Sequence, residues 1–214
     1  MGPITFTLAS VLVALLVVVL MQLFKKPQTP APAAAPVEDL ANLKPAQARA
    51  GDVISIAGAG DGMTDLDFNS DRCTWFQAGT HTWFELSGPY RERRVAMRVD
   101  TSGDRSVCVD TDVRPPTLED LGLSEEDLAQ MDERQNTGDS FDFDGKVWMY
   151  RMSREIQSTR SDQPQPTGFY CWEFQEQSGS GLIAIRKEQA EPFAVTRYRG
   201  IPAADVTIYR GTKG

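Results

Sequence analysis

Short runs of β-branched and aromatic residues recur between residues 52 and 210, and turn-forming residues separate them. The connections between these runs are short and suit hairpins rather than helical crossovers, so the pattern predicts antiparallel strands. The expected fold class is mainly β, an antiparallel β-sandwich or small barrel with one short helix. The runs predict strands at residues 52–57, 73–77, 81–87, 91–99, 105–110, 140–144, 146–152, 168–174, 182–187, 193–198 and 206–210.

Three turn signals mark where these strands reverse. Asp144 and Gly145 stand between two strand runs and predict a type I′ hairpin, in which both central residues take positive φ. The Ser-Gly repeat at residues 178–181 and the pair Gly88 and Pro89 predict two further reversals.

Four tryptophans fall in separate strand runs. An indole ring buries a large apolar area, so core packing is the expected role, with the lining of a groove as the alternative for some of them. They are Trp75, Trp83, Trp148 and Trp172.

One helix is expected after residue 124. Ser124 and Asp127 form a capping-box pattern that predicts a helix N-terminus, and the helix should end near Arg134. Leu128 and Met131 make a narrow apolar stripe, so the helix is expected to cover a sheet edge or a barrel mouth. The long connection that contains it divides the strands into an earlier and a later set.

Residues 4–24 form a run of 21 residues without a charge. As a helix this run rises ~31 Å, which matches a hydrocarbon core of roughly 30 Å. A cleaved signal peptide is the alternative, since small residues at 31–35 offer a cleavage site. The run is too long for a signal sequence and no basic side chain precedes it, so it predicts a transmembrane anchor.

Four prolines among residues 27–36 predict an extended, semi-rigid linker. The expected organisation is an anchor at 1–26, a Pro/Ala-rich linker at 27–42 and a β-rich domain at 43–214. Lys25 and Lys26 are the first charges after the anchor, and the positive-inside rule therefore predicts a single-pass protein of the cell membrane with a cytoplasmic C-terminal domain.

The chain is acidic, with 22 Lys and Arg residues against 30 Asp and Glu residues and a formal net charge of -8. A nucleic-acid partner is not expected, because phosphate contacts need a basic face. Both anchor-side lysines lie outside the β domain, so that domain is more acidic still and an anionic lipid surface would repel it. Contact with the membrane is therefore expected through residues 4–24.

Alternate oxygen-bearing residues in the segment 65–71 resemble the first half of a calcium-binding loop. Ser70 stands where such a loop needs glycine, and Phe76 stands where a bidentate glutamate should close the site. Asn and Asp also dominate ordinary turns, so a divalent-cation site is the weaker interpretation. Its candidate ligands are Asp65, Asp67, Asn69 and Asp71.

Catalytic residues are not predicted. His81 is the sole histidine and lies in a strand run beside Trp83, where a partly buried sheet residue is expected. Pairing of His81 with a Cys73 or Cys108 thiolate stays open, although no spacing favours it. Three scattered cysteines without a Cys-x-x-Cys pair predict buried thiols, with one disulfide as the alternative.

No cofactor is predicted either. One histidine and scattered cysteines lack the ligand spacing of a zinc site. The glycines of residues 58–62 superficially resemble a dinucleotide fingerprint, but the helix that would bind the pyrophosphate does not follow them.

Arg91, Arg93 and Arg94 stand out on an acidic domain. In a strand the first two would share a face, which favours a solvated edge that resists aggregation. A patch that binds an anion or a protein partner is the functional alternative, since arginine is enriched at interfaces.

Several strand motifs together resemble the bacterial domain of unknown function 4178 family. They are GDVISIAG, WFEL, FDFDGKVWMYRM, FYCWEF, GLIAIRK, PFAVTRYRG and TIYRG, and the resemblance covers residues 43–211. It implies a β-rich module often encoded near membrane-stress and shell-forming proteins of the phage-shock type and near polyamine-synthase-like proteins. The family offers no catalytic residues to transfer.

These observations predict a membrane-anchored, non-catalytic interaction or sensing module with a protein partner, in a bacterial system for envelope stress or membrane maintenance. The alternatives are a domain that binds a small ligand, either a polycation or a divalent cation, and an uncharacterised enzyme.

Overall fold

The computed structural model describes residues 40, 42–101, 107–110 and 112–211. The predicted anchor and most of the linker lie outside these residues. In the part that is described, no helix is long and apolar enough to cross a membrane. The β-rich domain belongs to one compact unit.

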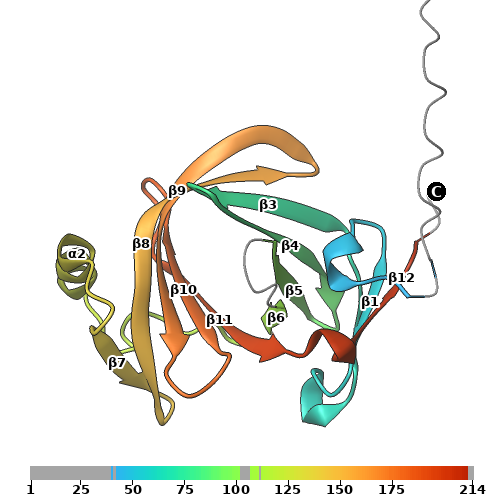
Figure 1. Ribbon diagram of the computed structural model, residues 1–214, viewed down its shortest axis with the longest axis horizontal. Coiled ribbons are helices and arrows are strands. Elements are labelled where there is room, and N and C mark those ends of the chain that lie inside the picture. Colours follow the sequence, from blue (N-terminus) through green and yellow to red (C-terminus); the bar gives the residue numbers. More distant parts are fainter. Residues whose placement is uncertain (1–39, 41, 102–106, 111, 212–214) are drawn as a thin grey trace, which may run out of the picture. The chain divides into compact units, whose positions relative to one another are not determined.

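Most of the described chain is β structure, as expected (Figure 1). The strands are β1 (Val53–Ile56), β2 (Leu66–Asn69), β3 (Arg72–Ala78), β4 (His81–Tyr90), β5 (Arg93–Asp100), β6 (Val107–Asp110), β7 (Ser140–Phe143), β8 (Lys146–Arg160), β9 (Gln163–Glu176), β10 (Leu182–Lys187), β11 (Ala194–Ile201) and β12 (Val206–Tyr209). The helical elements are α2 (Glu125–Arg134) and the 3-10 turns η1 (Pro45–Gln47), η2 (Asp61–Met63) and η3 (Ala203–Asp205).

Eight of the described strands close into an antiparallel barrel in the order β3-β4-β5-β6-β11-β10-β9-β8. The strands β3–β6 form one meander and β8–β11 form a second, on either side of the long connection that contains α2. The two halves join where β6 pairs with β11 and where β3 pairs with β8. Of the two expected alternatives, a sandwich and a small barrel, the fold is therefore the barrel.

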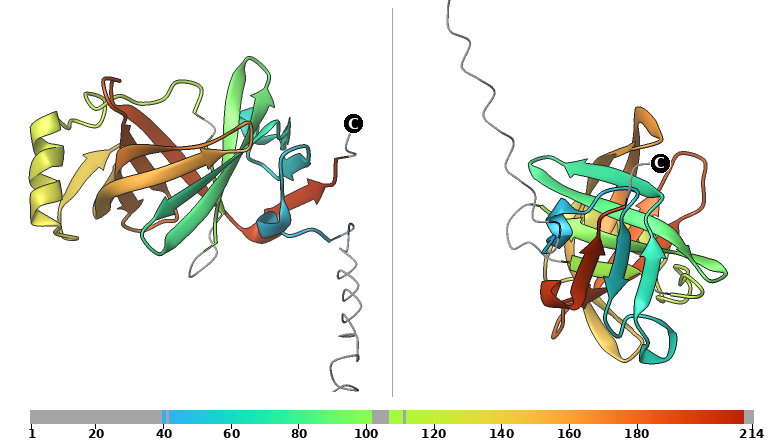
Figure 2. Two further views of the ribbon diagram at one scale, coloured as in Figure 1. Left: turned by 90° about the horizontal axis from the view of Figure 1, so that it is seen from above. Right: turned by 90° about the vertical axis from the view of Figure 1, so that its right-hand side faces the viewer.

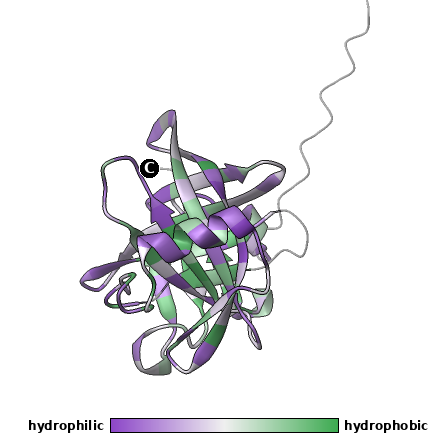
Figure 3. Cartoon of the chain, turned by 90° about the vertical axis from the view of Figure 1, so that its left-hand side faces the viewer, coloured by the Kyte–Doolittle hydropathy of each residue, from purple (hydrophilic) through white to green (hydrophobic). Residues whose placement is uncertain are grey.

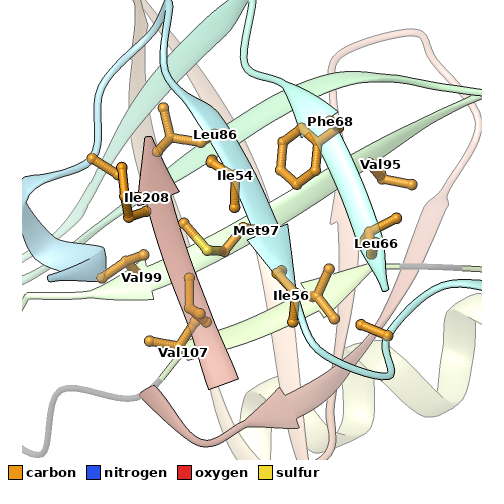
Figure 4. Packing of buried hydrophobic residues seen from close by; sticks show 14 of the residues in the cluster. Ile54, Ile56, Leu66, Phe68, Leu86, Val95, Met97, Val99, Val107 and Ile208 are labelled. Atoms are coloured by element: carbon orange, nitrogen blue, oxygen red, sulfur yellow. The ribbon is translucent and has the colours of Figure 1, made fainter. Parts of the chain in front are cut away.

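A small sheet, β12-β1-β2, covers the outside of one barrel wall (Figure 4). Its buried side chains alternate with outward-facing side chains that are mostly polar, as in a half-buried sheet. Ile54, Ile56 and Phe68 of this sheet share one hydrophobic cluster with Leu86 and Met97 of the barrel wall. Strands β4, β5 and β6 are therefore covered on both faces, which explains why apolar residues fill their outer positions.

The helix α2 begins and ends where the sequence predicts. The Ser124 hydroxyl accepts a hydrogen bond from the Asp127 backbone N–H at 3.1 Å, and the Asp127 carboxylate accepts one from the Ser124 N–H at 2.8 Å. The helix ends at Arg134, and Leu128 and Met131 are buried. These two capping hydrogen bonds confirm the capping box.

The helix covers the outer face of the barrel wall, not a sheet edge or a mouth (Figure 2). Leu128 and Met131 pack in one cluster with Trp172 and Ile185, and Nε1 of Trp172 donates to the backbone carbonyl of Leu128 at 3.0 Å. The expected position was wrong because β8, β9 and β10 carry large apolar side chains on their outer face as well. Figure 3 shows the largely hydrophilic helix in front of these strands.

Two turn predictions have opposite outcomes. Asp144 and Gly145 have φ values of 54° and 70° between β7 and β8, which confirms the predicted hairpin. Gly88 and its neighbouring proline lie inside β4, so the predicted reversal there was wrong. A Cβ at Gly88 would lie 2.0 Å from the backbone oxygen of Asn69, and glycine is thus needed for close approach of another strand.

Strand β2 was missed, because its polar residues resemble a turn. Leu66 and Phe68 are buried whereas Asp67 and Asn69 are exposed. The alternate spacing of oxygen-bearing side chains in this segment is therefore the period of a strand with one solvated face.

The tryptophan prediction holds for three of the four side chains. Trp83, Trp148 and Trp172 are buried. Trp75 is 51% exposed on the outer face of β3, where its ring lies 4.8 Å from that of Phe84. Its expected burial was wrong because neither the small sheet nor α2 extends over this part of the wall.

A buried carboxylate ties the end of the domain to its beginning. Asp52, which is 1% exposed, accepts hydrogen bonds from the Arg210 guanidinium at 2.7 Å and from the backbone N–H groups of Arg49 and Gly211 at 2.9 and 3.2 Å. These contacts hold the end of β12 beside the beginning of β1.

Replacing this carboxylate should destabilise the fold. We expect Asp52→Asn to lower the free energy of unfolding by about 3 kcal/mol, because the Arg210 charge loses its buried partner. Urea denaturation followed by tryptophan fluorescence measures the effect. Asp67→Asn, an exposed change of the same kind on β2, should stay within about 0.5 kcal/mol of the native chain. Equal effects of the two substitutions would contradict a stabilising role of the contacts made by the Asp52 carboxylate.

Candidate functional site

One end of the barrel opens into a cavity of about 1040 Å³. Strands β4, β6 and β10 begin at this end, and β5, β9 and β11 end there. Small-molecule sites in proteins have volumes of roughly 300–1,000 Å³, so the cavity is at the large end of that class. It is the candidate functional site.

A buried ion pair forms the floor of the cavity. The Arg98 guanidinium donates to the Glu173 carboxylate at 2.6 Å, and both residues are no more than 5% exposed. The guanidinium also lies 4.3 Å from the Trp83 ring centre, in a cation–π arrangement. Burial alone would lower the pKa of Arg98, but the charge of Glu173 outweighs it and the pKa is raised.

A second ion pair fills the barrel beyond this floor. Glu85 accepts a hydrogen bond from Arg186 at 2.6 Å and another from the Tyr198 hydroxyl at 2.7 Å. The Arg186 guanidinium lies 5.0 Å from the Phe76 ring and 5.5 Å from the Phe169 ring. Side chains therefore fill this part of the barrel, and the open space lies on the side of Arg98.

His81 lies at the rim of the cavity, at the start of β4. Its Nε2 is 3.0 Å from the Asp100 carboxylate and its ring is 5.3 Å from the Trp83 ring. The ring is half-buried, which confirms the prediction of a partly buried sheet residue. Among the described residues no hydroxyl or thiol is hydrogen-bonded to it, although a nucleophile beside its base is the mark of nucleophilic catalysis.

All three cysteines are buried and unpaired, as the sequence predicts. Burial raises the pKa of Cys73 to about 11 and that of Cys108 to about 12, and it also raises the pKa of Cys171. Cys108 lines the same cavity as His81. Its thiol stays protonated near neutral pH and is a poor nucleophile there.

Two arginines of β8 line the cavity from the side. Between Tyr150 and Met152 the pairing with β9 shifts by one residue, so Arg151 is the extra residue of a β-bulge. A bulge redirects a side chain that would otherwise follow the alternation of the strand. Arg151, Met152 and Arg154 consequently all line the cavity.

The candidate metal ligands lie away from the cavity. Asp65 accepts a hydrogen bond from the Gly58 backbone N–H at 3.0 Å. Asp71 accepts two from Arg94, at 2.7 and 2.8 Å, and would have to leave that arginine to bind a cation. In the described ranges no group of three or more His, Cys, Asp or Glu side chains is placed to hold a metal ion. A divalent-cation site at Asp65, Asp67, Asn69 and Asp71 stays a prediction.

The three prominent arginines contact acids of their own domain. Arg91 and Arg93 each lie 2.6 Å from the Asp61 carboxylate, and the hydrogen bond from Arg93 holds the pKa of that carboxyl below its usual value. Arg91 has a φ of 52° in the turn before β5, so it does not share a strand face with Arg93. A partner-binding role for these residues stays a prediction.

Closure of the barrel bears on the predicted solvated edge over only part of β5. Strand β5 pairs with β4 on one side and with β6 on the other. The pairing with β6 runs from Ala96 to Val99 and does not reach Arg93 or Arg94, so a solvated edge at these arginines stays a prediction.

The residues of the cavity floor were missed, although the sequence holds a signal for them. Charged residues interrupt otherwise apolar strand runs at Glu85, Arg98, Glu173 and Arg186. A charge in the middle of such a run must find a partner if the strand is buried on both faces. The sequence does not show which charges pair.

Comparison with protein-family models, with curated proteins and with solved structures found no match to this chain. The resemblance to the domain of unknown function 4178 family therefore stays a prediction.

Asp110 marks the opposite end of the barrel, where β6 ends. Burial raises the pKa of its carboxyl to about 6, and a hydrogen bond from the Asp112 backbone N–H at 3.1 Å opposes this rise. The folded protein therefore keeps this proton at a higher pH than the unfolded chain does, and the free energy of unfolding falls as the pH rises from about 4 to about 6.

Removing this titration should stabilise the protein above pH 6. We expect Asp110→Asn to raise the free energy of unfolding by about 2 kcal/mol at pH 7.5 and to leave it unchanged near pH 3.5. Urea denaturation at a series of pH values measures the difference. Asp142→Asn, on the exposed side of β7, is the matched control and should show no such trend. A parallel pH profile for native chain and Asp110→Asn would contradict the assignment.

Proposed function

We propose that this chain is a membrane-anchored, non-catalytic sensing module whose barrel binds a small molecule. The observation that carries the proposal is the cavity of about 1040 Å³ that ends on the buried Arg98–Glu173 pair. A sensing module needs a site that recognises its signal, and this cavity supplies one on a rigid element.

The geometry of the cavity favours selective binding. Ligand sites combine apolar walls with a few fixed polar groups. The guanidinium of Arg98 is fixed by Glu173 on one side and by the Trp83 ring on another. Its position is therefore set before a ligand arrives, and little conformational entropy is lost when one binds.

The chemistry at the cavity supports binding over catalysis. The side chain that contacts His81 through Nε2 is Asp100, and the nearby Cys108 thiol has a raised pKa. A module that binds without reacting would pass its signal to a protein partner. A setting in envelope stress or membrane maintenance rests on the resemblance of residues 43–211 described above.

The membrane anchor is part of the proposal. Residues 4–24 have the length and composition of a transmembrane helix, and Lys25 and Lys26 favour a cytoplasmic domain. The proline-rich residues 27–36 would hold that domain away from the anionic lipid surface, which repels its net negative charge.

Binding to the cavity can be tested with three six-carbon probes of different charge, hexanoate, hexanamide and hexylamine. The full chain in lipid nanodiscs is titrated by calorimetry, with empty nanodiscs as the blank. At least one probe should bind with a stoichiometry of one. Ala203→Trp, which fills the cavity from its lining, should weaken that binding by at least about tenfold, because a bulky ring occupies the site.

The neighbouring substitution is the control. Ala204→Trp adds the same bulk to the same exposed turn outside the cavity lining and should bind as the native chain does. Absence of saturable binding for all three probes, or equal binding by both tryptophan variants, would overturn the proposed binding site.

The anchor and its orientation can be tested with one added cysteine. The substitution Gln28→Cys places a thiol in the predicted linker. Because the native thiols are buried, a maleimide reagent should react at this new site. We expect a membrane-impermeant maleimide to label this variant in permeabilised cells and not in intact cells, with the native chain as the unlabelled control. Labelling in intact cells would place the domain outside, and recovery of the chain in the soluble fraction would contradict the anchor.

A further inference from the structure

The acidic groups of the cavity already have partners within the protein. Glu173 lies 2.6 Å from Arg98, and Asp100 lies 3.0 Å from His81. Each of these carboxylates therefore already contacts a side chain of the protein, and the charge of Glu173 is neutralised by Arg98.

The two arginines of β8 differ from this pattern. Arg151 and Arg154 form no ion pair and no hydrogen bond with any described residue, and both are exposed at the cavity wall. Elsewhere the arginines of this acidic domain are typically paired, as when Arg197 lies 2.8 Å from Asp112 and 2.9 Å from Asp144. The cavity thus holds two uncompensated positive charges.

The backbone brings these two charges to one side of the cavity. By strand alternation Arg154 shares a face with Met152, and the bulge adds Arg151 to the same lining. The Arg154 guanidinium reaches toward the turn between β3 and β4, since a Cβ at Gly79 would lie 3.9 Å from its Nη1. Both arginines therefore border the same cavity.

The other side of the cavity is apolar. Leu182 of β10 and Ile201 of β11 line it, together with Cys108 of β6 and residues of the turn η3. These strands neighbour one another in the order β6-β11-β10, and β9 separates them from β8. The site therefore has one cationic wall and one apolar wall.

We propose that the ligand of the barrel is a small amphipathic anion. Its acidic group, a carboxylate or a group of similar charge, binds Arg151 and Arg154, and its apolar body lies against Leu182 and Ile201. This inference rests on the proposed function and adds the chemical class of the ligand. A guanidinium is suited to a carboxylate because it donates two parallel hydrogen bonds.

The charge preference of the three six-carbon probes tests this proposal. With the full chain in nanodiscs at pH 7.5, hexanoate should bind at least about tenfold more tightly than hexanamide, and hexylamine should bind most weakly. The double variant Arg151→Gln with Arg154→Gln should lose the preference for hexanoate and keep its affinity for hexanamide within about twofold, because the apolar wall is unchanged.

A matched variant separates the local effect from a change in net charge. Arg114→Gln with Lys187→Gln removes two positive charges that do not line the cavity and should leave the preference for hexanoate intact. Thermal unfolding of all variants verifies that they remain folded, and added potassium chloride should weaken hexanoate more than hexanamide.

The outcomes distinguish this inference from the proposed function. Binding of hexanamide that Ala203→Trp blocks, without a preference for hexanoate, would overturn the anionic ligand and keep the binding site. Tighter binding of hexylamine than of hexanoate would also overturn it. Loss of the preference in the Arg114 and Lys187 variant would show that long-range charge, and not the cavity arginines, selects the probe. Failure of all three probes to bind would overturn the site itself.

Discussion

Two ion pairs cross the inside of the barrel, and the arrangement of its two halves depends on them. Arg98 of the first meander binds Glu173 of the second, and Glu85 of the first binds Arg186 of the second. Loss of one partner would leave a buried charge uncompensated, which is far more costly than loss of an exposed pair. The pairs therefore favour the one relative placement of the halves in which both charges are satisfied.

The same charges divide the inside of the barrel into a filled part and an open part. Glu85, Arg186 and Tyr198 form one hydrogen-bonded group beside aromatic rings, whereas Arg98 and Glu173 lie at the boundary of the cavity. Two of the three apolar clusters lie outside this interior, under the small sheet on one wall and under α2 on another, and the third, which includes Phe76 and Trp83, lies inside beside the charges. The inside is thus free to hold polar groups, because packing on the outer walls supplies much of the hydrophobic stabilisation.

Local sequence signals predicted most of the elements and little of the site. Ten of the twelve described strands begin within two residues of the position where an expected strand begins. The hairpin at Asp144 depends only on neighbouring backbone angles. The sequence does not predict the site because its paired charges are far apart in the chain: Arg98 and Glu173 are 75 residues apart, and Glu85 and Arg186 are 101 residues apart. The extra residue that directs Arg151 into the cavity is visible only in the pairing of β8 with β9.

The sequence by itself determined the strand content, the capped helix that begins after Ser124 and the burial of the three thiols, since each follows from local hydrogen bonding or from hydrophobic pattern. The tertiary structure decided that the strands close into a barrel, that a small sheet covers one wall and that two unpaired arginines and an apolar wall line one cavity. The physical reason is that closure and charge pairing join residues far apart in the chain, and no local preference specifies such partners.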